Sequence, residues 1–106
     1  MSNDMPFDYR PREPMRYMAV FMDCARGIFM LEDEEAGRIF KALYKVAEDY
    51  SQSYDASIEI DPDGLSILGK YIGDQLASGV KRAEDSRRET SYNRSKANGG
   101  GRPTKT

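Results

Sequence analysis

The clearest pattern of apolar and polar positions lies in the middle of the chain. Between about Glu34 and Tyr50, apolar side chains return every three or four residues, and charged side chains fill most positions between them. This is the spacing of an amphipathic helix with one buried face. Asp33 is the predicted N-cap, because the acids around it suit the positive end of a helix dipole. The sequence therefore predicts a helix over about residues 34–50.

A nearly continuous apolar stretch precedes this helix. From Met15 to about Phe29 the apolar residues follow the helical period, and a second stripe of methionines runs beside the first. A helix that is apolar almost all round belongs at the centre of a fold or against a partner. We therefore expect a first helix over residues 15–29, with Met18 and Met22 as candidate contacts for self-association.

A third helix is predicted to begin near Asp63 or Gly64. Branched apolar residues recur at near-heptad spacing as far as Val80, and the charged stretch that follows is expected to continue the helix to about residue 94. Within it, small residues recur every four positions and form a smooth strip that another helix can approach closely. This strip is a second candidate surface for self-association, and it consists of Gly69, Gly73 and Ala77.

Proline and glycine mark the two ends of the chain. Three prolines within residues 1–14 interrupt any helix there, and a run of glycines after Asn98 ends the third helix. The predicted fold is therefore all-α. A small three-helix domain with an extended third helix covers residues 15–94, between a disordered or loosely docked arm (residues 1–14) and a flexible basic tail (residues 95–106).

Length and cysteine content narrow the class of protein. A chain of 106 residues with two unpacked ends has a thin core, which favours a homo-oligomer. Cys24 is the only cysteine, and its apolar surroundings favour a small buried hydrophobe in a reducing compartment. The longest apolar run, Tyr17 to Met22, is too short to cross a bilayer. We therefore expect a cytoplasmic protein that makes no membrane contact.

The distribution of charge adds a candidate partner. Residues 1–80 carry 8 basic and 15 acidic side chains, whereas residues 81–106 carry 8 basic and 3 acidic ones, which gives net charges of −7 and +5. A basic end on an acidic body suggests contact with a polyanion such as DNA, and a merely solvated surface is the alternative. The candidate nucleic-acid contacts are Arg87, Arg88, Arg94, Lys96, Arg102 and Lys105.

The tail also contains a short motif. Gly101-Arg102-Pro103 resembles the centre of an AT-hook, in which an extended tripeptide places arginine in a narrow minor groove. The match is partial, because glycine stands where the hook has a further arginine before its core. A solubilising linker is the alternative interpretation of the same glycine-rich segment.

The residue types needed for catalysis are missing. The chain has no histidine and one cysteine, and no carboxylate pair lies four residues apart on an apolar helix face. Acid–base, nucleophilic and zinc chemistry therefore lack their usual groups. We expect no catalytic residue, no metal, no cofactor and no small-molecule substrate, and hence no enzyme.

The order of these elements resembles a family of short uncharacterised domains from phages, prophages and other mobile elements. The resemblance covers about residues 16–105 and departs from the family at the longer loop from Asp49 to Gly64. It is carried by an aromatic-rich first helix, a Leu-x-Asp-Glu-Glu turn, two further helices and a closing Gly-Gly-Arg-Pro-x-Lys, here Tyr17–Met30, Leu31–Glu35, Ile39–Tyr50, Leu65–Arg88 and Gly100–Lys105. The resemblance implies a setting in phage replication modules and carries over no binding residue.

Two functions from different classes follow. The first is an accessory protein of a mobile element that holds DNA without sequence preference through its basic end, with a helical body for assembly. Binding of this kind is mostly electrostatic and weakens steeply with salt. The second is an oligomerisation or protein-interaction module without nucleic-acid contact. The expected partners are DNA, a second copy of the chain or a phage replication protein.

Overall fold

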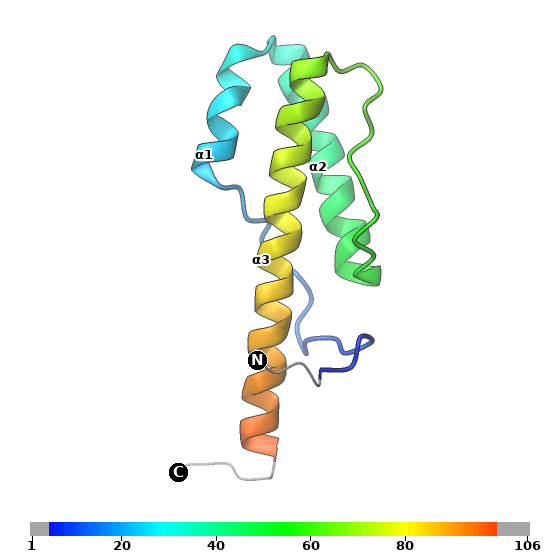
Figure 1. Cartoon of the computed structure of the whole chain (residues 1–106), viewed down its shortest axis with the longest axis vertical. Coiled ribbons are helices and arrows are strands. Elements are labelled where there is room, and N and C mark those ends of the chain that lie inside the picture. Colours follow the sequence, from blue (N-terminus) through cyan, green and yellow to red (C-terminus); the bar gives the residue numbers. More distant parts are fainter. Residues whose placement is uncertain (1–4, 100–106) are drawn as a thin grey trace.

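The computed structural model describes residues 5–99. Its elements are a short helix α1 (Met22–Ala25), a 3-10 helix η1 (Arg26–Met30), and two long helices, α2 (Asp33–Ser53) and α3 (Ile67–Gly99). The long helices lie side by side at one end of the molecule, and α1 and η1 lie along α3 there (Figure 1). The second half of α3 projects beyond this bundle. No strand forms within residues 5–99, so the all-α prediction is confirmed.

The second predicted helix is confirmed in place and face. Its buried residues all belong to the predicted stripe, and they are Ile39, Leu43, Val46, Ala47 and Tyr50. The helix ends where Tyr54 takes a left-handed conformation (φ 58°) and donates its N–H to the carbonyl of Tyr50 at 2.8 Å. The predicted N-cap is wrong by one residue: Glu32 holds that position without a side-chain cap, and Asp33 is already helical.

The start of α3 is fixed by a contact with α2. Ser66 accepts a hydrogen bond from the N–H of Gly69 at 3.0 Å, and Glu35 Oε2 accepts from both the N–H and the hydroxyl of Ser66, at 2.6 and 2.7 Å. These bonds favour the charged carboxylate and lower the pKa of Glu35. A Cβ at position 69 would lie 2.0 Å from Glu35 Oε2. A side chain at position 69 would therefore displace the Glu35 carboxylate from Ser66.

The loop of residues 54–66 runs back along the α2–α3 pair and completes its core. Ile60 is 2% exposed and belongs to the same apolar cluster as the two helices. Its Cδ1 would lie 2.6 Å from a Cβ at Gly73, so the loop and α3 touch where α3 has no side chain. Lys81 Nζ donates to the carbonyls of Ala56, at 2.8 Å, and Ile58. The loop is thus held against α3 at both places.

The first predicted helix is wrong over half its length. Residues 15–21 have no helical structure, and only α1 and η1 follow the prediction. Met15 and Met18 pack against the core from this non-helical stretch, and the Phe21 ring approaches Gly79 of α3. Extended chain advances about 3.3 Å per residue against 1.5 Å in a helix. The arm lies beside the projecting part of α3, whereas α1 and η1 lie towards the opposite end of the molecule (Figure 1). Because residues 15–21 are extended, these few residues are enough to span the distance between the two.

Candidate nucleic-acid interface

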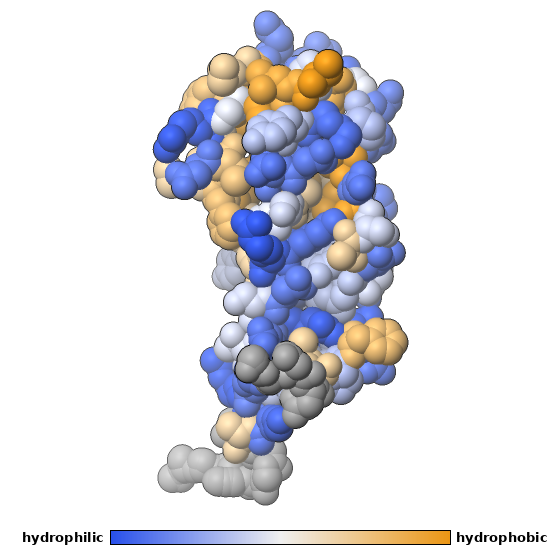
Figure 2. All heavy atoms as spheres, viewed as in Figure 1, coloured by the Kyte–Doolittle hydropathy of each residue, from blue (hydrophilic) through white to orange (hydrophobic). Residues whose placement is uncertain are grey.

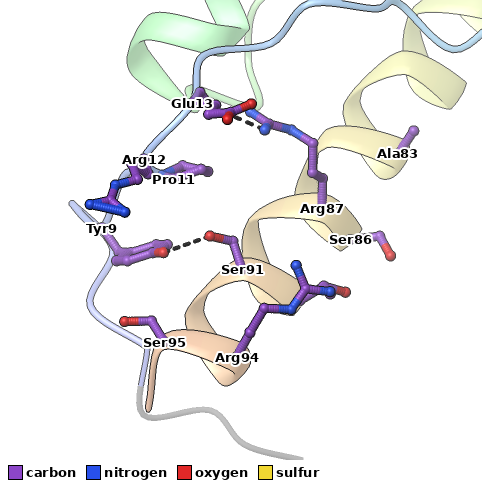
Figure 3. Close-up of a pocket in the computed structure, with 11 residues that line it drawn as sticks. Tyr9, Pro11, Arg12, Glu13, Ala83, Ser86, Arg87, Ser91, Arg94 and Ser95 are labelled. Atoms are coloured by element: carbon purple, nitrogen blue, oxygen red, sulfur yellow. Dashed lines mark hydrogen bonds between the residues drawn. The ribbon is translucent and has the colours of Figure 1, made fainter. Parts of the chain in front are cut away.

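A groove of about 1020 Å³ lies between the N-terminal segment and the second half of α3 (Figure 3). We call residues 5–14 the arm. Residues of the arm between positions 9 and 13 form one wall of the groove, and one face of α3 forms the other. Both walls supply arginine, and α3 adds a row of hydroxyl groups. Its principal polar lining residues are Arg12, Arg87, Arg94, Ser86, Ser91 and Ser95.

Helical spacing brings the α3 side of the groove together. Arg87, Ser91 and Arg94 follow each other at intervals of four and three residues, which places them on one face of the helix. The later part of α3 projects beyond the end of α2, and the arm lines the opposite wall of the groove there (Figures 1 and 3). The projecting half of α3 therefore offers a surface that the core does not use.

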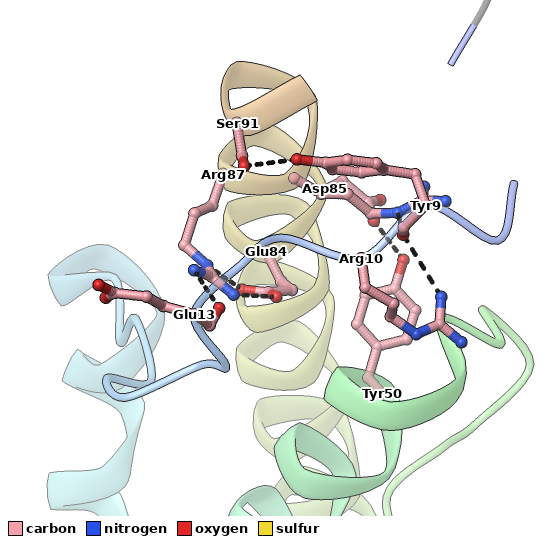
Figure 4. Close-up of polar contacts among 9 residues, drawn as sticks. Tyr9, Arg10, Glu13, Tyr50, Glu84, Asp85, Arg87 and Ser91 are labelled. Carbon is pink, nitrogen blue, oxygen red and sulfur yellow. Dashed lines mark hydrogen bonds and ion pairs between the residues drawn. The ribbon is translucent and has the colours of Figure 1, made fainter. Parts of the chain in front are cut away.

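Arg87 is fixed between the two walls. Its Nε and Nη2 each donate to a carboxylate oxygen of Glu84 at 2.9 Å, and its Nη1 donates to the carbonyl of Glu13 at 3.1 Å (Figure 4). Glu84 is only 3% exposed, so this paired geometry is held in place. The hydrogen bonds to Glu84 raise the pKa of Arg87. Much of the Arg87 charge is balanced inside the protein, and its main effect is to anchor the arm.

The arm is also held by an aromatic contact. The hydroxyls of Tyr9 and Ser91 lie 2.7 Å apart, within hydrogen-bond distance, and the Tyr9 ring meets Tyr92 edge to face at 5.2 Å between centroids. The arm is also bound to α2, because Arg10 donates to the carbonyl of Gln52 at 2.9 Å. The sequence left open whether residues 1–14 form a disordered or a docked arm. Residues 5–14 are docked on α3, and residues 1–4 lie outside the described residues.

Arg88 has a role that the sequence did not indicate. It is 9% exposed and donates to three carbonyls of the arm, those of Pro6 at 3.0 Å, Tyr9 at 3.0 Å and Phe7. Its guanidinium also lies over the Tyr54 ring, 4.2 Å from the centroid. A cation committed in this way is not available to a phosphate. Arg88 is therefore corrected from a predicted nucleic-acid contact to the residue that binds the arm.

A polar contact beside Arg88 closes the end of the α2–α3 pair. Tyr50, 3% exposed, donates its hydroxyl to Asp85 of α3. Burial raises the pKa of Tyr50, and the hydrogen bond to Asp85 raises it further. The Tyr50 ring also meets Tyr54 edge to face at 5.6 Å. The Tyr54 ring under the Arg88 guanidinium is therefore itself packed against a buried residue of α2, Tyr50.

The other predicted contacts have different positions. Arg94 lines the groove and is exposed, and Lys96 Nζ lies 5.8 Å from the Tyr92 ring centroid on the same helix. Residues 95–99 of the predicted flexible tail are helical, and Arg102 and Lys105 lie outside the described residues. Sequence reasoning missed Arg12, although an arginine between two prolines in a mixed-charge segment was a signal for it.

The predicted self-association strip is already used within the chain. Gly69 lies against Glu35, Gly73 against Ile60, and Ala77 is 4% exposed in the core. These three residues are therefore corrected from an intermolecular groove to intramolecular contacts. Met18 is half-buried against the core, and Met22 is 82% exposed, so of the five predicted residues Met22 alone stands on open surface.

No family model, curated protein or solved structure matches the chain. Over residues 5–99, no three side chains of histidine, cysteine, aspartate or glutamate are gathered as a metal site would require. In the same part of the chain, no helix combines the length and apolar character needed to cross a membrane.

Proposed function

We propose that the protein associates with DNA through the arm–α3 groove and the basic residues that follow it. The observation that carries this proposal is the meeting of Arg12 and Arg94 in one groove beside a row of serine hydroxyls. Arginine and hydroxyl side chains are the groups that most often contact phosphate oxygens, and such contacts position a protein on DNA without reading its sequence.

The balance of charge in the groove supports a phosphate ligand. Three arginines and one glutamate line it, and Arg87 is neutralised from behind by Glu84. Arg12 and Arg94 then face a single lining carboxylate, that of Glu13, which itself lies 3.9 Å from Arg16. A polyanion therefore meets a net positive groove, and its binding releases counterions from the DNA.

The geometry argues against reading of a base sequence by a helix-turn-helix. The two long helices are joined by residues 54–66, a much longer connection than the three or four residues of that motif. We infer binding to the phosphate backbone of DNA, with no strong preference for sequence. The proposed setting, a cytoplasmic accessory role in a phage or prophage replication module, rests on the resemblance of the sequence alone.

The test is fluorescence anisotropy of labelled duplex and single-stranded DNA at two salt concentrations. Arg94→Gln removes a groove cation, and Arg26→Gln removes a cation of the opposite end, whose side chain is 78% exposed. If Arg94 makes one phosphate contact, its loss lowers the slope of log affinity against log salt by about 0.9. Arg26→Gln is expected to bind as the unchanged protein does.

A chain ending at Asn98 separates the groove from the tail. Salt-dependent binding that survives truncation and falls further in Arg94→Gln supports the groove. Affinity that ignores salt, or equal binding by Arg94→Gln and Arg26→Gln, contradicts the proposal. Absence of binding by both the full and the shortened chain also contradicts it and favours the interaction module without nucleic-acid contact.

A further inference from the structure

Large apolar side chains stay exposed at the end of the molecule opposite the groove. Figure 2 shows tan and orange spheres, which mark hydrophobic residues, over η1 and the first turns of α3. The two elements touch here, because a Cβ at Gly27 would lie 2.8 Å from Ile72. We call this surface the end face. Its residues and exposed fractions are Phe29 93%, Met30 73%, Ile67 92%, Leu68 42% and Tyr71 62%.

The size of the end face is that of an interface. A large side chain contributes about 200 Å² when fully exposed, so these exposed fractions amount to about 700 Å². The largest apolar patch of a typical monomer covers about 300–600 Å². A standard protein interface takes about 800 Å² from each partner. The end face therefore exceeds an ordinary surface patch and nearly supplies one side of a stable complex.

The chemistry of the end face favours a second copy of the same chain. None of its five side chains is charged. Beside it, Arg26 is paired with Asp23 at 3.6 Å and Lys70 with Asp74 at 2.6 Å. An uncharged apolar face meets the same face of a second copy across a two-fold axis without burying a charge. Within residues 5–99 the core also holds only ten buried apolar residues, and small domains of this kind commonly gain stability by oligomerisation.

We propose that two copies associate symmetrically through their end faces. The contact is made mainly by Phe29 of η1 and by Ile67 and Tyr71 of α3, with Met30 and Leu68 filling the space between them. The groove begins sixteen residues after Ile67 on α3, which is about 24 Å along the helix. Dimerisation through the end face therefore leaves both grooves accessible. The proposed dimer does not depend on whether the protein binds DNA.

The experiment measures the mass of the full chain by sedimentation equilibrium over a wide range of concentrations. The expected result is a shift from 12.0 kDa towards twice that mass as concentration rises. Ile67→Glu and Phe29→Ser are expected to remain monomers with unchanged helix content, because both side chains are more than nine-tenths exposed. Phe7→Ser is the matched control, since Phe7 is 88% exposed on the arm, and it is expected to dimerise.

Three results overturn the proposal. One is a single-chain mass for the unchanged protein at every concentration. Another is a dimer that persists in Ile67→Glu and Phe29→Ser. The third is a monomer that sediments with uncharged phosphatidylcholine vesicles and loses this property in Ile67→Glu, which assigns the end face to a lipid surface.

Discussion

Replacement of Arg88 by methionine tests whether one buried cation holds the arm in place. The variant keeps an unbranched apolar stem against the Tyr54 ring and removes every donor to the arm carbonyls of Pro6, Phe7 and Tyr9. The helical core of α2, α3 and the loop between them does not include Arg88. We therefore expect the arm to detach while the helices remain folded.

The size of the effect follows from the contacts that are lost. A hydrogen bond from a charged donor contributes about 1.5–3 kcal/mol to stability. The three contributions do not add in full, because a detached arm returns its carbonyls to water. Arg87 and Tyr9 also keep part of the docking. We expect Arg88→Met to lower the free energy of unfolding by about 2–3 kcal/mol, the scale of one or two such bonds.

Hydrogen exchange and limited trypsin digestion measure the two parts of this prediction separately. Detachment accelerates exchange of the Tyr9 amide, which donates to the Pro6 carbonyl at 3.1 Å, and cleavage after Arg12. The amides of α2 are expected to stay protected. Arg94→Met is the control, because Arg94 is exposed on the same helix. Loss of protection throughout α2, or an arm as protected as in the unchanged protein, refutes the reasoning.

Two further substitutions test the packing. Gly73→Ala gains about 1 kcal/mol of helix propensity but overfills the contact with Ile60 by about 1–3 kcal/mol, so thermal melting is expected to show a net loss of stability; Gly37→Ala, with open space around it, is expected to gain about 1 kcal/mol. Glu35→Gln removes a carboxylate whose lowered pKa stabilises the fold above the ordinary value of 4.5 and ceases to do so as pH falls through the folded value. The melting temperature of Glu35→Gln is expected to be lower than that of the unchanged protein at neutral pH. On acidification it is expected to decrease by less than the melting temperature of the exposed control Glu34→Gln.

The sequence predicted the two long helices because each buries a regular stripe. Every buried residue of α2 belongs to the predicted stripe, although Phe40, predicted on the same face, is 62% exposed. The charged extension of α3 was expected to about residue 94, against an observed end at Gly99. The first helix was overestimated since Met15 and Met18 reach the core from extended chain as well as they would from a helix. Apolar spacing alone does not distinguish these cases when the path of the chain is set by distant contacts.

The candidate site was predictable in part. Charge asymmetry drew attention to the basic end of the chain, and one residue predicted there as a nucleic-acid contact, Arg94, lines the groove. Local patterns carried no sign that Arg88 binds carbonyls about eighty residues away, because that pairing depends on the path of the arm. The strip of Gly69 and Gly73 was correctly recognised as a place of close approach, but spacing does not say whether the approaching group belongs to the same chain.

The Arg88 contact also sets an order in which the protein is assembled. It joins residues 79 to 82 positions apart, so forming it closes a loop that spans most of the described residues. The arm is synthesised before α3, and its binding residue is made about eighty residues later, which at roughly 5–20 residues per second is a delay of about 4–16 s. During this interval the arm has no docking partner. A nascent-chain protease or chaperone therefore has access to the arm until Arg88 has been made.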